Sequence, residues 1–152
     1  MCAALIEHEI YGVRATVISA CNGWVIFEIS FDPPEVLRTY PIERVRVTVP
    51  PTGPPVAVSL DCDRPFLHRY PRIDPSKLAR VRIPGLEFLA GALCLWFPDD
   101  PLHLRWSWAK GFVDFVRIVQ RHLWYEEFWR RNGKWPVEDA HEEITVSTAK
   151  AA

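Results

Sequence analysis

The sequence has no long apolar run and no large excess of charge of either sign. No stretch of about 20 apolar residues occurs, so no transmembrane helix is expected. The formal net charge is -1, so no overall electrostatic field favours binding to nucleic acid or to an anionic membrane. The first residues include Glu7 and Glu9 but no lysine or arginine, unlike a secretory signal peptide. We therefore expect a cytoplasmic protein that binds neither nucleic acid nor a membrane.

The sequence also lacks the common motifs of metal, phosphate and hydrolase sites. It has no Gly-rich phosphate loop, no Ser-centred nucleophile elbow and no HExxH sequence. The 4 cysteines include no CxxC pair, and together with the 5 histidines they do not show zinc-ligand spacing. We therefore expect no cofactor and no metal site, and cysteines that remain thiols in a reducing compartment.

Proline and tryptophan, by contrast, are abundant and unevenly placed. Most of the 14 prolines lie in the first two thirds of the chain, whereas most of the 7 tryptophans lie in the last third. This distribution predicts strands broken by rigid turns, followed by a helical layer anchored by large aromatic side chains.

Four segments near the start of the chain have the pattern of β-strands. They are residues 13–20, 24–31, 44–49 and 56–60. The first two are joined by Asn22 and Gly23, which are typical of a two-residue hairpin turn because both tolerate positive φ. The third alternates polar and apolar residues, as a strand with one wet face does. Tight turns between consecutive strands predict a four-stranded antiparallel meander.

Residues 107–131 have a helical pattern. Apolar residues recur there every three or four positions, with charged residues on the opposite face. Ser107 suits an N-cap and Asn132-Gly133 suits a C-terminal stop. The predicted fold class is α+β, with C-terminal helices packed on one face of the sheet. We expect one domain over residues 1–143 and a flexible tail over residues 144–152.

Cys94 is the candidate nucleophile. It lies in an apolar run that ends at Pro98. A thiol at the end of such a run can be held rigidly and still reach solvent, in which case it could form a thioester. Cysteine is also among the most frequently buried residues, in which case Cys94 is simply part of the core. The residues alone leave both interpretations open.

Two other elements could contribute to a site at Cys94. His68, in the preceding loop, could act beside the thiol as a hydrogen-bonding group or could pin backbone carbonyls of its own loop. Asp99 and Asp100 follow Cys94 closely and could orient an incoming amine, although they also suit a polar turn.

The segment Gly91–Trp96 (GALCLW) resembles the sequence around the active cysteine of ubiquitin-conjugating enzymes. The resemblance is closer to their bacterial relatives in antiphage operons, in which a His-x-Tyr element precedes the cysteine, as His68-Arg69-Tyr70 does here. Those relatives share a C-terminal signature that is matched by Tyr125, Glu126, Trp129, Gly133, Trp135, Pro136 and His141. The resemblance covers residues 13–141.

The resemblance implies a ubiquitin-conjugating (UBC-like) fold and a transferase. Cys94 would accept the C-terminus of a partner protein as a thioester and pass it to an amine, and His68 would order the loop beside the thiol. The implied partner has a flexible C-terminal tail: a cGAS/DncV-like nucleotidyltransferase of type II CBASS antiphage operons, or a ubiquitin-like protein. An activating enzyme, where one is required, would act in trans.

The sequence departs from the eukaryotic family at the oxyanion donor and at the amino-terminal helix, among other positions. The eukaryotic His-Pro-Asn triplet supplies an asparagine for the oxyanion, and no asparagine stands near His68, so another donor is required. Only residues 2–9 precede the first strand, which implies a reduced form of the amino-terminal helix that helps to dock the activating enzyme.

Two alternatives to the enzyme stay open. A non-catalytic module of the same fold would hold a partner's C-terminal tail without chemistry. An α+β structural protein would instead use its Trp-rich helix as an oligomer interface. Both alternatives predict an unreactive Cys94, whereas the transferase requires an accessible thiol.

Overall fold

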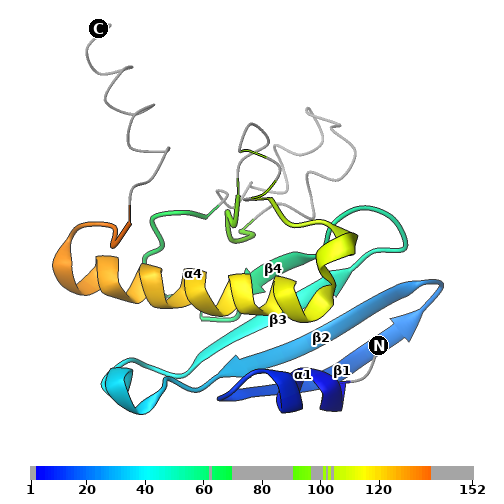
Figure 1. Ribbon diagram of the computed structural model, residues 1–152, viewed down its shortest axis with the longest axis horizontal. Coiled ribbons are helices and arrows are strands. Elements are labelled where there is room, and N and C mark those ends of the chain that lie inside the picture. Colours follow the sequence, from blue (N-terminus) through cyan, green and yellow to red (C-terminus); the bar gives the residue numbers. More distant parts are fainter. Residues whose placement is uncertain are drawn as a thin grey trace, which may run out of the picture.

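The computed structural model describes residues 3–61, 63–69, 91–96, 101, 103 and 105–137, and shows an α+β protein (Figure 1). In chain order the elements are α1 (Ala3–Glu9), β1 (Val13–Cys21), β2 (Trp24–Phe31), the 3-10 helix η1 (Glu35–Leu37), β3 (Glu43–Val49), β4 (Val56–Ser59), the 3-10 helix η2 (Trp108–Lys110) and α4 (Phe112–Asn132). No helix in this part of the chain has the length and apolar character needed to cross a membrane.

The four strands form the antiparallel meander that the sequence predicts. Their order in the sheet is β1-β2-β3-β4, so each strand pairs with its neighbour in the chain. Asn22 and Gly23 have φ values of 50° and 80°, and Cys21 pairs with Trp24 across the turn. Both turn residues therefore adopt the left-handed backbone that a two-residue hairpin of this type requires, which confirms the predicted hairpin.

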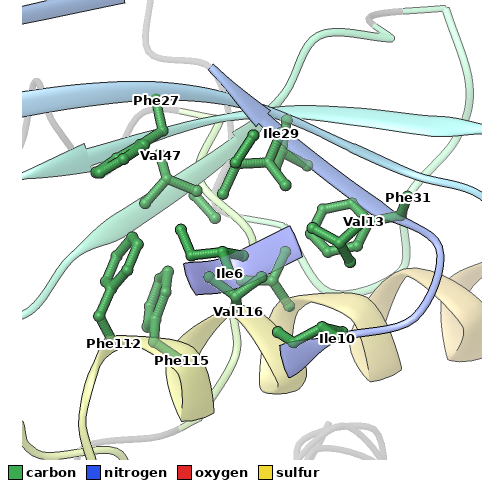
Figure 2. Packing of buried hydrophobic residues seen from close by; sticks show 14 of the residues in the cluster. Ile6, Ile10, Val13, Phe27, Ile29, Phe31, Val47, Phe112, Phe115 and Val116 are labelled. Carbon is green, nitrogen blue, oxygen red and sulfur yellow. The ribbon is translucent and has the colours of Figure 1, made fainter. Parts of the chain in front are cut away.

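One face of the sheet carries the core, and α1 and α4 cover that face. Phe27 and Ile29 of β2 point into it and are at most 1% exposed. Figure 2 shows Ile6 of α1 and Val116 of α4 meeting on the same side of the sheet as Val47 of β3. Full burial of such a side chain stabilises the fold by roughly 1.5–3 kcal/mol. This layer therefore fixes α4 firmly against the sheet.

The start of α4 differs from the prediction. Ser107 precedes η2 rather than α4, and its side chain makes no capping hydrogen bond. The helix begins at Phe112, after Gly111 with φ 82°, because this glycine interrupts the helical backbone. The indole Nε1 of Trp106 donates to the carbonyl of Gly111 at 2.8 Å and holds the break in place. The assignment of Ser107 as the helix N-cap was therefore wrong.

The end of α4 matches the prediction. Gly133 has φ 70°, and its N–H donates to the carbonyl of Trp129 at 2.7 Å. This is the left-handed glycine that commonly ends a helix. The predicted domain boundary at residue 143 and the predicted tail over residues 144–152 lie outside the described residues.

Candidate functional site

The segment that carries Cys94 lies against the free edge of β4. Ala92 pairs with Val58 in an antiparallel bridge, and the N–H of Leu93 donates to the carbonyl of Ala57 at 2.8 Å. Leu93 is 4% exposed and packs into the core. The main chain just before Cys94 is therefore tied to the sheet.

On its other side the same segment is tied to residues 63–69, which we call the His68 loop. Arg69 pairs with Leu93, and the N–H of Cys94 donates to the carbonyl of His68 at 2.9 Å. Cys94 is half-buried, and its Sγ lies 3.9 Å from the carbonyl oxygen of Trp96. The two candidate residues thus meet through their main chains, and Cys94 is neither fully enclosed nor fully exposed.

The His68 loop is held in turn by Glu126 of α4. Glu126 is 0% exposed, and each of its carboxylate oxygens accepts one backbone N–H, from Leu67 and from His68, both at 2.8 Å. Nε2 of His122, one helical turn earlier, lies 3.3 Å from Oε1 of Glu126. Burial alone would raise the pKa of Glu126, but His122 and the two N–H groups outweigh it and hold that pKa below its ordinary value.

The imidazole ring of His68 packs against tryptophan. Its centroid lies 4.5 Å from that of Trp135 in an edge-to-face arrangement, and Tyr125 and His122 also contact Trp135, at 5.6 and 5.7 Å. The N–H of His68 therefore donates to Glu126 of α4, its carbonyl accepts from the N–H of Cys94, and its ring packs against Trp135. This arrangement suits a residue that organises the loop beside the thiol.

A second buried cluster holds the beginning of the His68 loop. Oε1 of Glu43 accepts from Arg64 at 2.8 Å and from Arg130 at 3.0 Å. Arg130 also donates to Glu127 at 2.7 Å and to the carbonyl of Pro65 at 2.9 Å. These contacts join the start of β3, the loop and the end of α4. The loop is therefore tied to α4 at Pro65 as well as at Leu67 and His68.

The two carboxylates of this cluster respond differently to their surroundings. Burial raises the pKa of Glu43 despite its two arginines, and its Oε2 has no hydrogen-bond partner among the described residues. In Glu127, the contacts with Arg131 and Arg130 outweigh the effect of burial and lower the pKa.

A small apolar hollow of about 110 Å³ lies beside the same segment. Residues 54–57 and Ala92, Leu93, Leu95 and Trp96 line it. The residues on either side of Cys94 contribute to its wall, but Cys94 is not among the described residues that line it.

Four residues of the predicted site and of the matched motifs, Asp99, Asp100, Tyr70 and His141, lie outside the described residues. Cys21 is an exposed thiol on β1. Within the part of the chain that the structure describes, no group of three His, Cys, Asp or Glu side chains could hold a metal ion.

The importance of Glu126 was not foreseen from the sequence, although it belongs to the matched C-terminal signature. The available signal was a glutamate in the apolar stripe of α4, one turn after Leu123. A carboxylate at a core position requires buried donors. Those donors are backbone groups, which no sequence pattern reveals.

Family models, curated proteins and solved structures give no match to this chain. Cys94 and the groups around it are therefore the basis for assigning a function.

Proposed function

We propose that this protein is a ubiquitin-conjugating-like transferase that forms a thioester through Cys94 with the C-terminus of a partner protein in bacterial antiphage defence. The order of elements supports the proposal. A short α1, a four-stranded meander, a cysteine segment beside β4 and a helix on one face follow one another as the resemblance to the UBC-like fold implies.

The single observation that carries the proposal is the setting of Cys94. Cys94 is half-buried, while its main chain is bonded to His68 at 2.9 Å and its neighbour Leu93 to Ala57 at 2.8 Å. A nucleophile held by a rigid frame and still reachable loses little freedom when an acyl group arrives.

The reaction transfers an acyl group in two steps. The thiolate of Cys94 attacks the carbonyl carbon of an activated C-terminus, forms a C–S bond and expels the donor's leaving group with its electron pair. The proton of the Cys94 thiol passes to solvent. An amine then attacks the thioester, forms an amide, loses a proton and releases Cys94 as thiolate. The partner is a cGAS/DncV-like nucleotidyltransferase or a ubiquitin-like protein with a flexible C-terminal tail.

The oxyanion of each step needs a donor other than the main chain at Cys94. The N–H of Cys94 is already directed at the carbonyl of His68. Removing one oxyanion donor typically slows acyl transfer about a hundredfold or more. We therefore expect the partner or the acceptor to bring a donor, or the loop to supply a different N–H group.

A trapping experiment tests the proposal. Cys94→Lys replaces the thioester with an amide, so co-expression with the partner should yield an adduct that resists thiol reductants. Lysine introduced instead at the exposed Cys21 is the matched control and should yield none. The opposite outcome is a Cys94→Lys protein that forms no adduct under conditions in which the wild type is modified. That result would argue against Cys94 as the acceptor of the tail.

The second candidate is a non-catalytic module of the same fold that holds a partner's tail. The contact of the Cys94 sulfur with the carbonyl oxygen of Trp96, at 3.9 Å, favours it, because a thiol engaged in this way is less available as a nucleophile. In that case Cys94→Ala should leave binding of the tail unchanged, and no covalent adduct should form with the wild type.

A further inference from the structure

We propose that Glu126 is a positioning residue for the thiol of Cys94. The inference rests on the proposed function, and it names the group that keeps the site in its reactive geometry. Glu126 holds the His68 loop, and the carbonyl of His68 holds the main chain of Cys94.

The first step in this connection is the anchoring of Glu126 itself. The helix face that carries it also carries Phe115, Val119 and Leu123, all 0% exposed. A buried side chain in a close-packed core has little freedom to move. The carboxylate is therefore presented to the loop from a rigid base.

The second step is the match between the carboxylate and the loop. An ionised carboxylate offers two acceptor oxygens, and the loop presents two successive N–H groups, those of Leu67 and His68, each 2.8 Å from its own oxygen. Glutamine would offer one oxygen and turn an NH2 donor toward a backbone N–H. Aspartate would keep the charge but fall short by one methylene.

The third step runs through a single residue. His68 receives Glu126 at its N–H and Cys94 at its carbonyl, so both peptide groups that flank its Cα are fixed. Loosening the first contact should therefore loosen the second. Leu93 is bonded to Ala57 of the sheet instead, so its N–H should not respond.

Glu127 provides the matched comparison. It is also a largely buried carboxylate of α4, but it is bonded to Arg130 and Arg131 and to neither of these loop N–H groups. A change at Glu127 perturbs the charge and stability of the same helical turn. It reaches the loop through Arg130 at Pro65, and it removes none of the hydrogen bonds that link Glu126, His68 and Cys94.

The test is residue-resolved amide hydrogen exchange in Glu126→Gln and Glu127→Gln. In Glu126→Gln the amides of Leu67, His68 and Cys94 should exchange about tenfold faster, as expected for the loss of a hydrogen bond to a charged group. The amide of Leu93 should keep its wild-type rate. Glu127→Gln should leave all four rates close to those of the wild type.

A purely structural role predicts a different pattern. In that case Leu93 would lose protection together with Cys94, or Cys94 would keep its protection in Glu126→Gln, and either result would overturn the proposal. Glu126→Asp is the second variant, because it places no side-chain amide in the core. It should show the same selective loss of amide protection.

The rate of adduct formation separates this inference from the proposed function. Amide exchange is measured without a partner. If the wild type forms no adduct, the proposed function is wrong, but the exchange rates still show whether Glu126 fixes the main chain of Cys94. Where the wild type does form an adduct, Glu126→Gln should form it about tenfold more slowly. An unchanged rate would show that Glu126 does not position the thiol.

Discussion

The carboxylate of Glu126 on α4 lies 2.8 Å from the backbone nitrogen of His68, which is 58 residues earlier in the chain. Through this contact the C-terminal helix reaches the loop that borders Cys94. The packing of α4 onto the sheet therefore places the carboxylate that the His68 loop binds.

The first prediction concerns acid stability. Because the pKa of Glu126 is below its ordinary value of 4.5, its contribution to the free energy of unfolding is complete above that pH and is lost as pH falls through the lowered pKa. Glu126→Gln should be less stable than the wild type at neutral pH, and its stability should fall less steeply below pH 4.5. Urea unfolding at a series of pH values measures both.

Glu43 serves as the comparison of opposite sign. Its pKa is raised, so its contribution is complete at low pH and decreases as pH rises through 4.5. Glu43→Gln removes this titration, so the free energy of unfolding of this variant should decrease more steeply in acid than that of the wild type. Parallel pH profiles for Glu126→Gln and the wild type would contradict the assignment of Glu126 as a carboxylate with a lowered pKa.

The second prediction concerns Arg130, whose side chain is 9% exposed. Lysine cannot reproduce its simultaneous contacts with Glu43, Glu127 and the carbonyl of Pro65, so Arg130→Lys should cost about 2 kcal/mol of stability. Chemical denaturation provides the measurement. Arg121→Lys, at an exposed position of the same helix, is the control and should change stability by less than about 0.5 kcal/mol. Equal effects in the two variants would contradict the role given to the cluster.

The third prediction concerns the β1–β2 hairpin. Gly23→Ala places a Cβ at φ 80° and 3.1 Å from Cβ of Pro51, and should lower stability by about 1–2 kcal/mol. Asn22→Gly, at the other positive-φ position of the turn, should be close to neutral because glycine tolerates that backbone. Thermal unfolding of the two variants measures both effects. A Gly23→Ala protein as stable as the wild type would show that the turn has another conformation.

How far the sequence predicts this fold depends on whether each signal is local. Asn22-Gly23 and Asn132-Gly133 act within a few residues, because the positive φ values of Asn22 and Gly23 define a hairpin turn and that of Gly133 defines a helix end. The start of α4 was misplaced because the break at Gly111 is stabilised by Trp106, a tertiary contact that a capping pattern does not contain.

The candidate site shows the same limit. Cys94 and His68 could be singled out from residue type and resemblance, but the bond between them joins two main chains and leaves no trace in the sequence. Glu126 fits the helical spacing of the core, and its function depends on N–H groups 58 and 59 residues away. Contacts to backbone atoms over such distances are set by the packing of α4, and only the three-dimensional structure reveals them.

The fourth prediction concerns access to the thiol. Cys21 is exposed and Cys94 is half-buried, so iodoacetamide should label Cys94 more slowly than Cys21 in the folded protein and still modify it fully. Peptide mapping after timed labelling gives both rates in one sample. Complete protection of Cys94 until the protein unfolds would favour the non-catalytic module.

The most direct test is intact-mass spectrometry of the protein after co-expression with the genes that adjoin its own. The wild type should carry an adduct equal to the mass of a partner less one water, released by a thiol reductant and absent from Cys94→Ala. Cys21→Ala should carry it unchanged. An adduct that survives in Cys94→Ala, or a wild type that never acquires one, would contradict the assignment of Cys94 as a thioester-forming nucleophile.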